Sequence, residues 1–149
     1  MPTTPLTTTR HAPHEGRLLR AVDVTTGADG GARLCAAECE SCGTRIFPSA
    51  AVCPSCNAER LRPLALSERG TLYAYSTVHV APAIWQTPYV IGYVDLPEGV
   101  RIFGKVDPAD DLRPDMPVRI RIEAASDIAG AKDVTTTGSN AFHYWFTAR

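Results

Sequence analysis

Two short cysteine motifs contain residues that can bind a metal ion. Cys39 and Cys42 form one Cys-x-x-Cys pair, and Cys53 and Cys56 form a second pair after ten intervening residues. Each pair can hold one side of an ion from a tight turn, and two turns together complete a tetrahedron of thiolates. The spacing predicts a structural zinc site, because four cysteine ligands leave no open position for an activated water molecule.

Disulfide bonds or a redox-active Cys-x-x-Cys are the alternatives for these cysteines. A disulfide scaffold is typical of secreted chains, but this sequence begins with MPTTP and shows no apolar signal segment. Gly43, directly after the first pair, and Pro54, inside the second, favour the sharp bends that a metal-binding turn requires. The remaining cysteine, Cys35, is expected to be a buried packing thiol.

Composition limits the class of protein. The 149 residues are 44% hydrophobic and 21% charged, with a net charge of −1. This near-neutral balance disfavours a general attraction to nucleic acid or to an anionic membrane. Because no apolar run is long enough to span a bilayer, we expect no membrane partner. The prediction is a soluble cytoplasmic protein, in which reduced thiols are available for metal.

The pattern along the chain predicts three regions. Residues 1–16 are rich in Thr and Pro and are expected to be disordered, or ordered only by a partner. Residues 17–66 hold the cysteine motifs and their lead-in strands. This region has too few large apolar residues for a core of its own, so it is expected to need metal to fold. Residues 67–149 form the third region.

The third region shows the alternation of β-strands. Leu72, Ala74, Val78 and Val80 are expected to share one face of the first strand. Further strands are predicted at 89–96, 100–106, 118–123 and 141–146, and Pro97-Glu98-Gly99 is predicted to be a hairpin turn. The predicted fold is mainly β: an N-terminal rubredoxin-like four-cysteine zinc ribbon, followed by a five-stranded OB-fold barrel.

Several local motifs follow one another in a specific order between residues 34 and 122. Cys39-x2-Cys42-Gly43 precedes Phe47-Pro48 and Cys53-Pro54-x-Cys56, and these are followed by GTLYAYSTVH from Gly70, by Pro88-Tyr89-Val90 and by VDLPEGVR from Val94. This order resembles the acyl-CoA-associated zinc-ribbon and OB-fold proteins. Members of that family often have a longer helical segment before the ribbon, and the proline-bearing start of this chain departs from that pattern.

The resemblance implies an accessory subunit. Such proteins are bound to thiolase-superfamily enzymes, which include thiolases, thiolase-like aldolases and acyltransferases, and they support the acyl-CoA site of a partner that supplies the catalytic residues. For this chain it implies structural zinc, a coenzyme A thioester shared with the partner, and a role in lipid or aromatic degradation. No catalytic residue is assigned to the chain itself. Because thiolase-fold enzymes are usually dimers, a symmetric hetero-oligomer is expected.

An acyl-CoA site needs cations for phosphates and a flat apolar surface for adenine. If Val100, Ile102 and Val106 point inward, their neighbours on the strand point outward, as do two arginines of the next strand. Together with the linker tryptophan they form the candidate acyl-CoA residues: Arg101, Phe103, Lys105, Arg119, Arg121 and Trp85. The alternative is that these are solvated residues on the outer face of a barrel.

Two other functions compete with an accessory subunit. A basic face with aromatic residues would also suit single-stranded nucleic acid, which stacks its bases on aromatic rings, but the net charge disfavours that partner. A free-standing enzyme is the other class. Against it, the sequence contains no Gly-x-Ser-x-Gly elbow and no Gly-rich phosphate loop.

Overall fold

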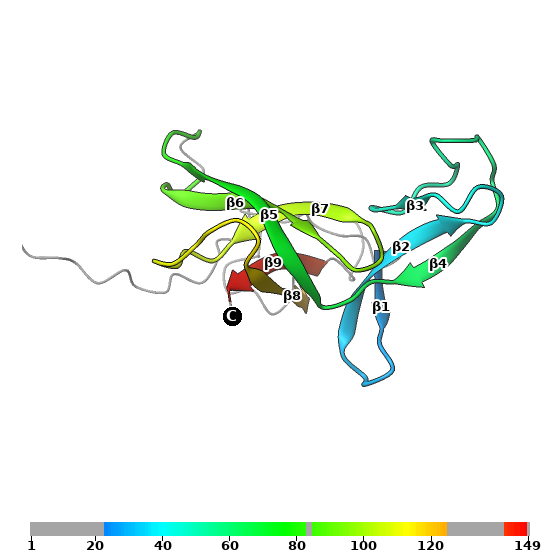
Figure 1. Cartoon of the computed structure of the whole chain (residues 1–149), viewed down its shortest axis with the longest axis horizontal. Helices are drawn as coiled ribbons and strands as arrows, with labels where there is room; N and C mark the ends of the chain where they lie inside the picture. The colour runs from blue at the N-terminus through cyan, green and yellow to red at the C-terminus, as the bar shows by residue number, and fades with distance from the viewer. Residues whose placement is uncertain (1–22, 83–84, 125–141, 149) are drawn as a thin grey trace, which may run out of the picture.

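The structure is a computed structural model that describes residues 23–82, 85–124 and 142–148. In these ranges the chain forms a four-stranded sheet and a closed five-stranded barrel, which lie end to end (Figure 1). The predicted tail at residues 1–16 lies outside the described ranges. Within those ranges, no helix is long and apolar enough to cross a membrane.

The first sheet is built around one central strand. Its strands are β1 (Val24–Thr26), β2 (Ala32–Cys39), β3 (Arg45–Ile46) and β4 (Leu61–Ala65). β2 pairs antiparallel with each of the other three. Four consecutive residues of β2, from Leu34 to Ala37, are buried. Both faces of this strand are therefore covered, and its last residue is the first cysteine of the metal motif.

The barrel confirms the predicted five-stranded OB fold. Its strands are β5 (Arg69–Val78), β6 (Tyr89–Asp95), β7 (Arg101–Val106), β8 (Pro117–Ala124) and β9 (Phe142–Ala148). They close in the order β5-β6-β7-β9-β8, and only the pairing of β7 with β9 is parallel. The predicted hairpin turn joins β6 to β7, and Gly99 adopts the positive φ of 76° that closes it.

The sheet and the barrel share one hydrophobic core. Leu72, Val94 and Phe146 are completely buried inside the barrel, and the same cluster of contacts includes Leu34 of β2 and Leu66 of the connection. The backbone N–H of Leu66 also donates to the carbonyl of Leu34 at 2.8 Å. Burial across the junction therefore fixes the cysteine-bearing sheet against the barrel.

A β-bulge in β5 changes which side chains face the barrel interior. Leu72 lies opposite Val94, but the next pair joins Ala74 to Tyr93, so Tyr73 is the additional residue. Tyr93 is exposed, and residues directly opposite each other share a face, so Ala74 lies on the outer face. The prediction that Leu72, Ala74, Val78 and Val80 share one face is therefore wrong. Val78, like Ala74, lies beyond the bulge. Val80 lies outside the strand and is 90% exposed.

Gly70 lies where β5 meets β8 to close the barrel, and it permits no side chain there. A methyl group would lie 2.6 Å from the carbonyl oxygen of Asp95 and 2.6 Å from Cγ1 of Val94. We expect Gly70→Ala to lower the free energy of unfolding by about 3 kcal/mol in urea denaturation, because backbone must move. Gly31→Ala is the control, since its methyl group meets only the side-chain ends of Arg33 and Asp29 and no backbone; equal losses would contradict the prediction.

Candidate functional site

The four paired cysteines converge at the end of the ribbon. Their sulfur atoms all lie within 4.8 Å of one another. The Cys39 and Cys56 sulfurs are 3.6 Å apart, as are those of Cys42 and Cys53. A tetrahedral ion with metal–sulfur bonds of about 2.3 Å places its ligands about 3.8 Å apart. The donor set and its spacing therefore fit a bound metal ion.

The two cysteine turns have the same backbone design. In the first, the N–H of Gly43 donates to the carbonyl of Cys39 at 2.9 Å; in the second, Asn57 donates to Cys53 at 2.9 Å. Gly43 and Asn57 both have positive φ values, 72° and 59°. The sequence predicts a turn at Gly43, but the matching role of Asn57 was not predicted. Asn57 directly follows the second cysteine pair, and this position was the available signal for the turn. Asparagine tolerates the left-handed conformation better than most residues.

The surroundings of Cys42, an exposed cysteine, favour its ionised form. The sulfur of Cys42 lies 3.1 Å from the hydroxyl of Thr44. Hydrogen bonds from the Thr44 side chain and backbone lower the pKa of Cys42 to about 6. Because the thiolate is the form that binds metal, this environment suits Cys42 to be a ligand. In the same cluster, despite a hydrogen bond from the Ala58 backbone, contacts with Cys42 and Cys39 raise the pKa of Cys56 to about 12, so that thiol must lose its proton when a metal binds.

Cys35 stands apart from this cluster. It is buried, forms no disulfide, and lies in β2. Burial raises the pKa of the Cys35 thiol above its ordinary value, so the thiol stays protonated at neutral pH. This agrees with the prediction of a packing thiol.

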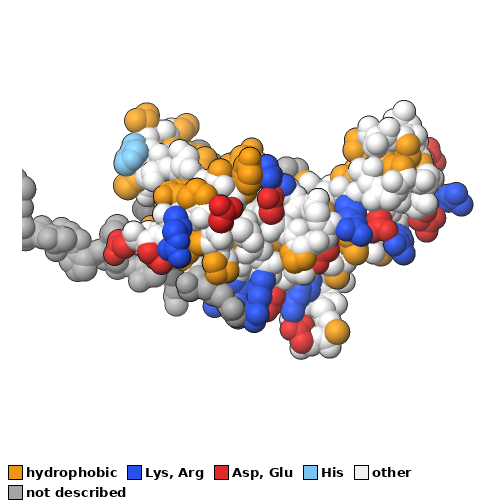
Figure 2. All heavy atoms as spheres, in the orientation of Figure 1, with side chains coloured by type: hydrophobic (Ala, Val, Ile, Leu, Met, Phe, Trp, Pro, Cys, Tyr) orange, Lys and Arg blue, Asp and Glu red, His pale blue; other side chains and the backbone are white. Residues whose placement is uncertain are grey.

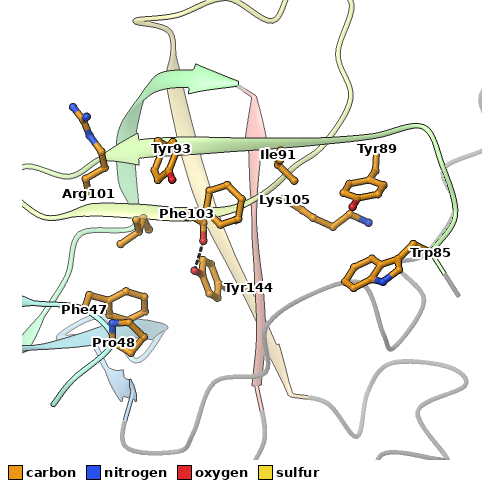
Figure 3. A pocket seen from close by; sticks show the side chains of 12 residues that line it. Phe47, Pro48, Trp85, Tyr89, Ile91, Tyr93, Arg101, Phe103, Lys105 and Tyr144 are labelled. Carbon is orange, nitrogen blue, oxygen red and sulfur yellow. Dashed lines mark hydrogen bonds between the residues drawn. The ribbon is translucent and has the colours of Figure 1, made fainter. Parts of the chain in front are cut away.

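A pocket of about 380 Å³ lies on the outer side of the barrel, where the loop after β3 approaches it (Figure 3). Phe47 and Pro48 of that loop form one end, and Trp85 with Tyr89 forms the other. The remaining wall comes mainly from the middle of three barrel strands: Ile91 and Tyr93 of β6, Phe103 and Lys105 of β7, and Tyr144 of β9.

The structure divides the candidate acyl-CoA residues into two groups. Trp85, Arg101, Phe103 and Lys105 all line the pocket. Arg119 and Arg121 are not among its lining residues. Arg119 is instead paired with Glu68, with 3.0 Å between the guanidinium nitrogen and the carboxylate oxygen.

The two cations of the pocket have different surroundings. Arg101 donates to both carboxylate oxygens of Asp95, at 2.6 and 2.9 Å, and its guanidinium lies 3.4 Å from the ring centre of Tyr73. The hydrogen bond from Arg101 lowers the pKa of Asp95. Lys105 is only 9% exposed, and its ammonium lies 5.1 Å from the ring centre of Tyr89. Arg101 is thus paired with a neighbouring carboxylate, and Lys105 is buried beside the ring of Tyr89.

Of the twelve residues that line the pocket, eight were not identified as site residues from the sequence, and these include Phe47, Pro48 and Tyr144. The Tyr144 hydroxyl donates to the carbonyl of Phe103 at 2.5 Å, and its ring meets that of Phe47 edge-on at 6.1 Å. Phe47-Pro48 belongs to the ordered motif series, and this was the available signal. No local pattern indicates that this ribbon loop folds back onto the barrel.

Hydrogen bonds hold the ribbon loop in place. Asp23, only 2% exposed, accepts hydrogen bonds from the Ser49 backbone at 3.2 Å and from its hydroxyl at 2.8 Å. Arg45 donates to the carbonyl of Glu98 at 2.5 Å, and the Glu98 carboxylate accepts from the Ser67 backbone at 2.9 Å and from its hydroxyl at 2.6 Å. The loop that carries Phe47 and Pro48 is therefore fixed on both sides.

Known proteins share parts of this architecture. Residues 64–123 match the family described as ChsH2, C-terminal OB-fold domain. The benzoylsuccinyl-CoA thiolase subunit BbsA of Thauera aromatica is 44% identical over 71 residues, which cover 48% of this chain and 49% of BbsA. A DUF35 domain-containing scaffold protein of Methanocaldococcus jannaschii is 40% identical over 95 residues, covering 61% of this chain and 65% of that protein.

Among solved structures, the Ltp2-ChsH2(DUF35) aldolase is similar, with a TM-score of 0.59 and 24% identity over 78% of this chain and 84% of that one. At this identity, the similarity shows the shared fold alone. This chain spans between about half and two thirds of the length of the curated relatives named above. Residues 64–123 of this chain are therefore similar to the C-terminal OB-fold domain of the ChsH2 family.

Proposed function

We propose that this protein is a non-catalytic accessory subunit of a thiolase-superfamily enzyme, and that it supports the partner's acyl-CoA site while carbon–carbon bonds are formed or cleaved. The observation that carries the proposal is a four-cysteine ribbon joined to a barrel whose relatives include a protein named as a thiolase subunit. In this assignment residues 17–66 are the ribbon, residues 67–149 are the barrel, and the partner supplies the catalytic groups.

The proposed metal is zinc with a structural role. Four thiol ligands at tetrahedral spacing suit zinc, and they leave no position for substrate or water. Cys39, Cys42, Cys53 and Cys56 would hold the ion. When bound, zinc supplies a cross-link between the two turns. The chain's own residues then keep β3 and the following loop against the barrel.

The proposed acyl-CoA contacts are centred on the pocket. Trp85 and Phe103 offer aromatic surface, and Lys105 and Arg101 are the basic side chains of the lining. Arg101 borders the same pocket but is paired with Asp95. Arg119 and Arg121 lie elsewhere, so we do not assign them to this part of the ligand. The proposed location is the cytoplasm. The proposed assembly is a symmetric hetero-oligomer, because thiolase-fold enzymes are usually dimers.

Single-stranded nucleic acid is the rival ligand, and one observation favours it. Tyr73, Tyr93 and Phe103 are each about half exposed on one outer face, as in barrels that stack bases. Against it, acidic and basic side chains are interspersed over the visible face in Figure 2, without a large patch of one sign. Oligonucleotide binding that falls steeply with salt would support this rival.

The test of the accessory role begins with a gentle pull-down of the tagged protein from its native source, followed by mass spectrometry. We expect a stoichiometric thiolase-like protein. The purified chain alone should show no thiolase or aldolase activity, and adding it to the partner should raise the partner's activity. Turnover of acyl-CoA by this chain alone would contradict the proposal.

A further inference from the structure

We propose that a cluster of arginines, where the first sheet meets the barrel, binds an acidic segment of the protein partner. The arginine cluster consists of Arg33 of β2, Arg69 of β5, and Arg119 and Arg121 of β8. These residues do not line the pocket described above. The inference rests on the proposed function for the identity of the partner, and it goes further by naming the surface that the partner meets.

Two of the arginines face each other where the barrel closes. Register places Arg69 of β5 directly opposite Arg119 of β8. The adjacent pair is Gly70 with Val118, and Val118 is completely buried, so the two arginines lie on the outer face. Like charges directly opposite each other in an antiparallel pair are destabilising. This part of the barrel therefore gains stability from any anion that lies beside both side chains.

A single carboxylate, that of Glu68, contacts three members of the cluster. Its Oε2 atom lies 3.0 Å from a guanidinium nitrogen of Arg119 and 3.4 Å from one of Arg33. Its Oε1 atom lies 3.8 Å from Nε of Arg69. Arg33 has a second partner, Asp29, at 2.6 Å. Because each guanidinium carries five N–H donors and a carboxylate has about four acceptor positions, Glu68 cannot accept from all the donors around it.

Arg121 extends the cluster along β8. It lies two residues beyond Arg119, and both side chains point outward because Ile120 between them is buried. Arg121 is exposed, and no ion pair among the described residues includes it. The four arginines together with Glu68 and Asp29 carry four positive and two negative charges, which leaves a net charge of +2.

The cluster connects the two parts of the fold. In Figure 1, β8 and the turn between β1 and β2 lie on the same, lower side of the molecule. Figure 2 shows Lys and Arg side chains along this edge, with acidic side chains among them. The ion pair of Arg33 with Glu68 joins β2 to the residue directly before β5. A segment bound here would therefore contact both the ribbon and the barrel.

Carboxylates of a protein suit this surface better than nucleic acid does. The cluster already holds two carboxylates, and guanidinium groups pair with carboxylates through parallel hydrogen bonds. The net charge of −1 disfavours a long polyanion. Glu123, the next outward residue after Arg121, also places an acidic group at the end of the cluster on β8. A short acidic segment would supply acceptors that Glu68 and Asp29 leave unfilled.

Reversing one charge of the cluster tests the inference in the full-length chain. Arg121→Glu breaks no ion pair among the described residues, so the midpoint of urea denaturation should not change. We expect it to weaken binding of the thiolase-like partner about tenfold and to reduce the salt dependence of that binding. Arg113→Glu is the matched control: Arg113 is also exposed, but its neighbour is Asp111, outside the cluster. It should weaken binding less than about twofold.

A cross-link of zero length identifies the acidic segment. Arg121→Lys keeps the charge and adds an amine to a chain that contains two lysines, Lys105 and Lys132. A carbodiimide joins an amine to a carboxylate that contacts it. We expect mass spectrometry of the complex to find the new amine linked to an aspartate or glutamate of the partner. Arg113→Lys should give no such link.

Undiminished partner binding by Arg121→Glu, with no cross-link from Arg121→Lys, would overturn the inference and leave the accessory role intact. A partner of another class that forms the cross-link and is lost on charge reversal would support the inference and remove the thiolase assignment. Recovery of no partner would contradict both. Loss of oligonucleotide binding in Arg121→Glu, with unchanged partner binding, would assign the cluster to nucleic acid and overturn the inference.

Discussion

Changing Cys42 or Cys56 to serine is expected to release the metal and to unfold the end of the ribbon. The segment between β2 and β4 contains only the two-residue strand β3, and its exposed residues include Val52, at 43%. A unit this small gains most of its folding free energy from metal binding. Zinc affinity should fall by more than about a hundredfold, since even the loss of an outer-shell partner costs about 10–100-fold. Zinc content per protein, measured by mass spectrometry, checks this.

The Cys42→Ser and Cys56→Ser proteins should also fail to bind the partner, because the ribbon loop would no longer be held. Cys35→Ala is the matched control: Cys35 is equally a cysteine, but it lies in the buried part of β2. It should keep its zinc and lose only about 1 kcal/mol of stability through its small cavity. A soluble complex of Cys42→Ser with the partner that contains no zinc would contradict the prediction.

The metal centre was predictable because its signal is local. A Cys-x-x-Cys turn carries its own geometry, and the doubled motif needs only two turns to meet. The sequence did not show how the turns are supported. Asn57 takes the role in the second turn that Gly43 has in the first, and both end in the left-handed conformation. An asparagine is a weaker signal than a glycine, so only the structure reveals the symmetry.

The barrel was predictable from alternation, but its faces were not predictable throughout. Alternation assumes that every residue on one strand has a partner on the next. Tyr73 has none, and the side chains after it therefore exchange faces. Nothing in the local sequence separates this strand from a regular one, because Tyr, Ala and Thr all fit either face. The bulge depends on pairing with β6, which is a long-range contact.

The candidate binding residues show the same limit. Alternation correctly placed Arg101, Phe103 and Lys105 on one outer face, but it does not identify what lies across the sheet. Register places Asp95 opposite Arg101, so that cation is neutralised. The loop residue Phe47 reaches the pocket from another region of the chain. A sequence indicates the strand face on which a side chain lies more readily than it indicates which residues that side chain contacts.

Removing the metal is expected to weaken the proposed acyl-CoA binding at the pocket, although no metal ligand lines it. Phe47 and Pro48 directly follow β3, whose only pairs with β2 are Ala37 with Ile46 and Glu38 with Arg45. Without the first cysteine turn, one end of this short strand is released. We expect the dissociation constant of acyl-CoA to rise about tenfold after chelation, because the loop would then occupy its binding position for only part of the time. Fluorescence of Trp85, which lines the pocket, measures it in the Trp145→Phe protein.

Hydrogen exchange measures the effect of the metal on the loop without any added ligand. Residues 45–49 should lose protection after chelation, while β6 and β8 keep theirs, because the barrel core contains no metal ligand. Asp23→Ala is the matched variant: it removes the acceptor for Ser49, so it should weaken acyl-CoA binding while zinc content stays unchanged.

Because coupling between two sites is reciprocal, acyl-CoA should raise zinc affinity by the same factor by which zinc raises acyl-CoA affinity. A chelator titration with and without saturating acyl-CoA measures the change in zinc affinity. Unchanged acyl-CoA affinity in the metal-free protein, together with intact protection of residues 45–49, would show that Asp23, the Arg45–Glu98 hydrogen bond and the Phe47–Tyr144 contact hold the loop without the metal. The metal would then stabilise the ribbon without acting on the pocket.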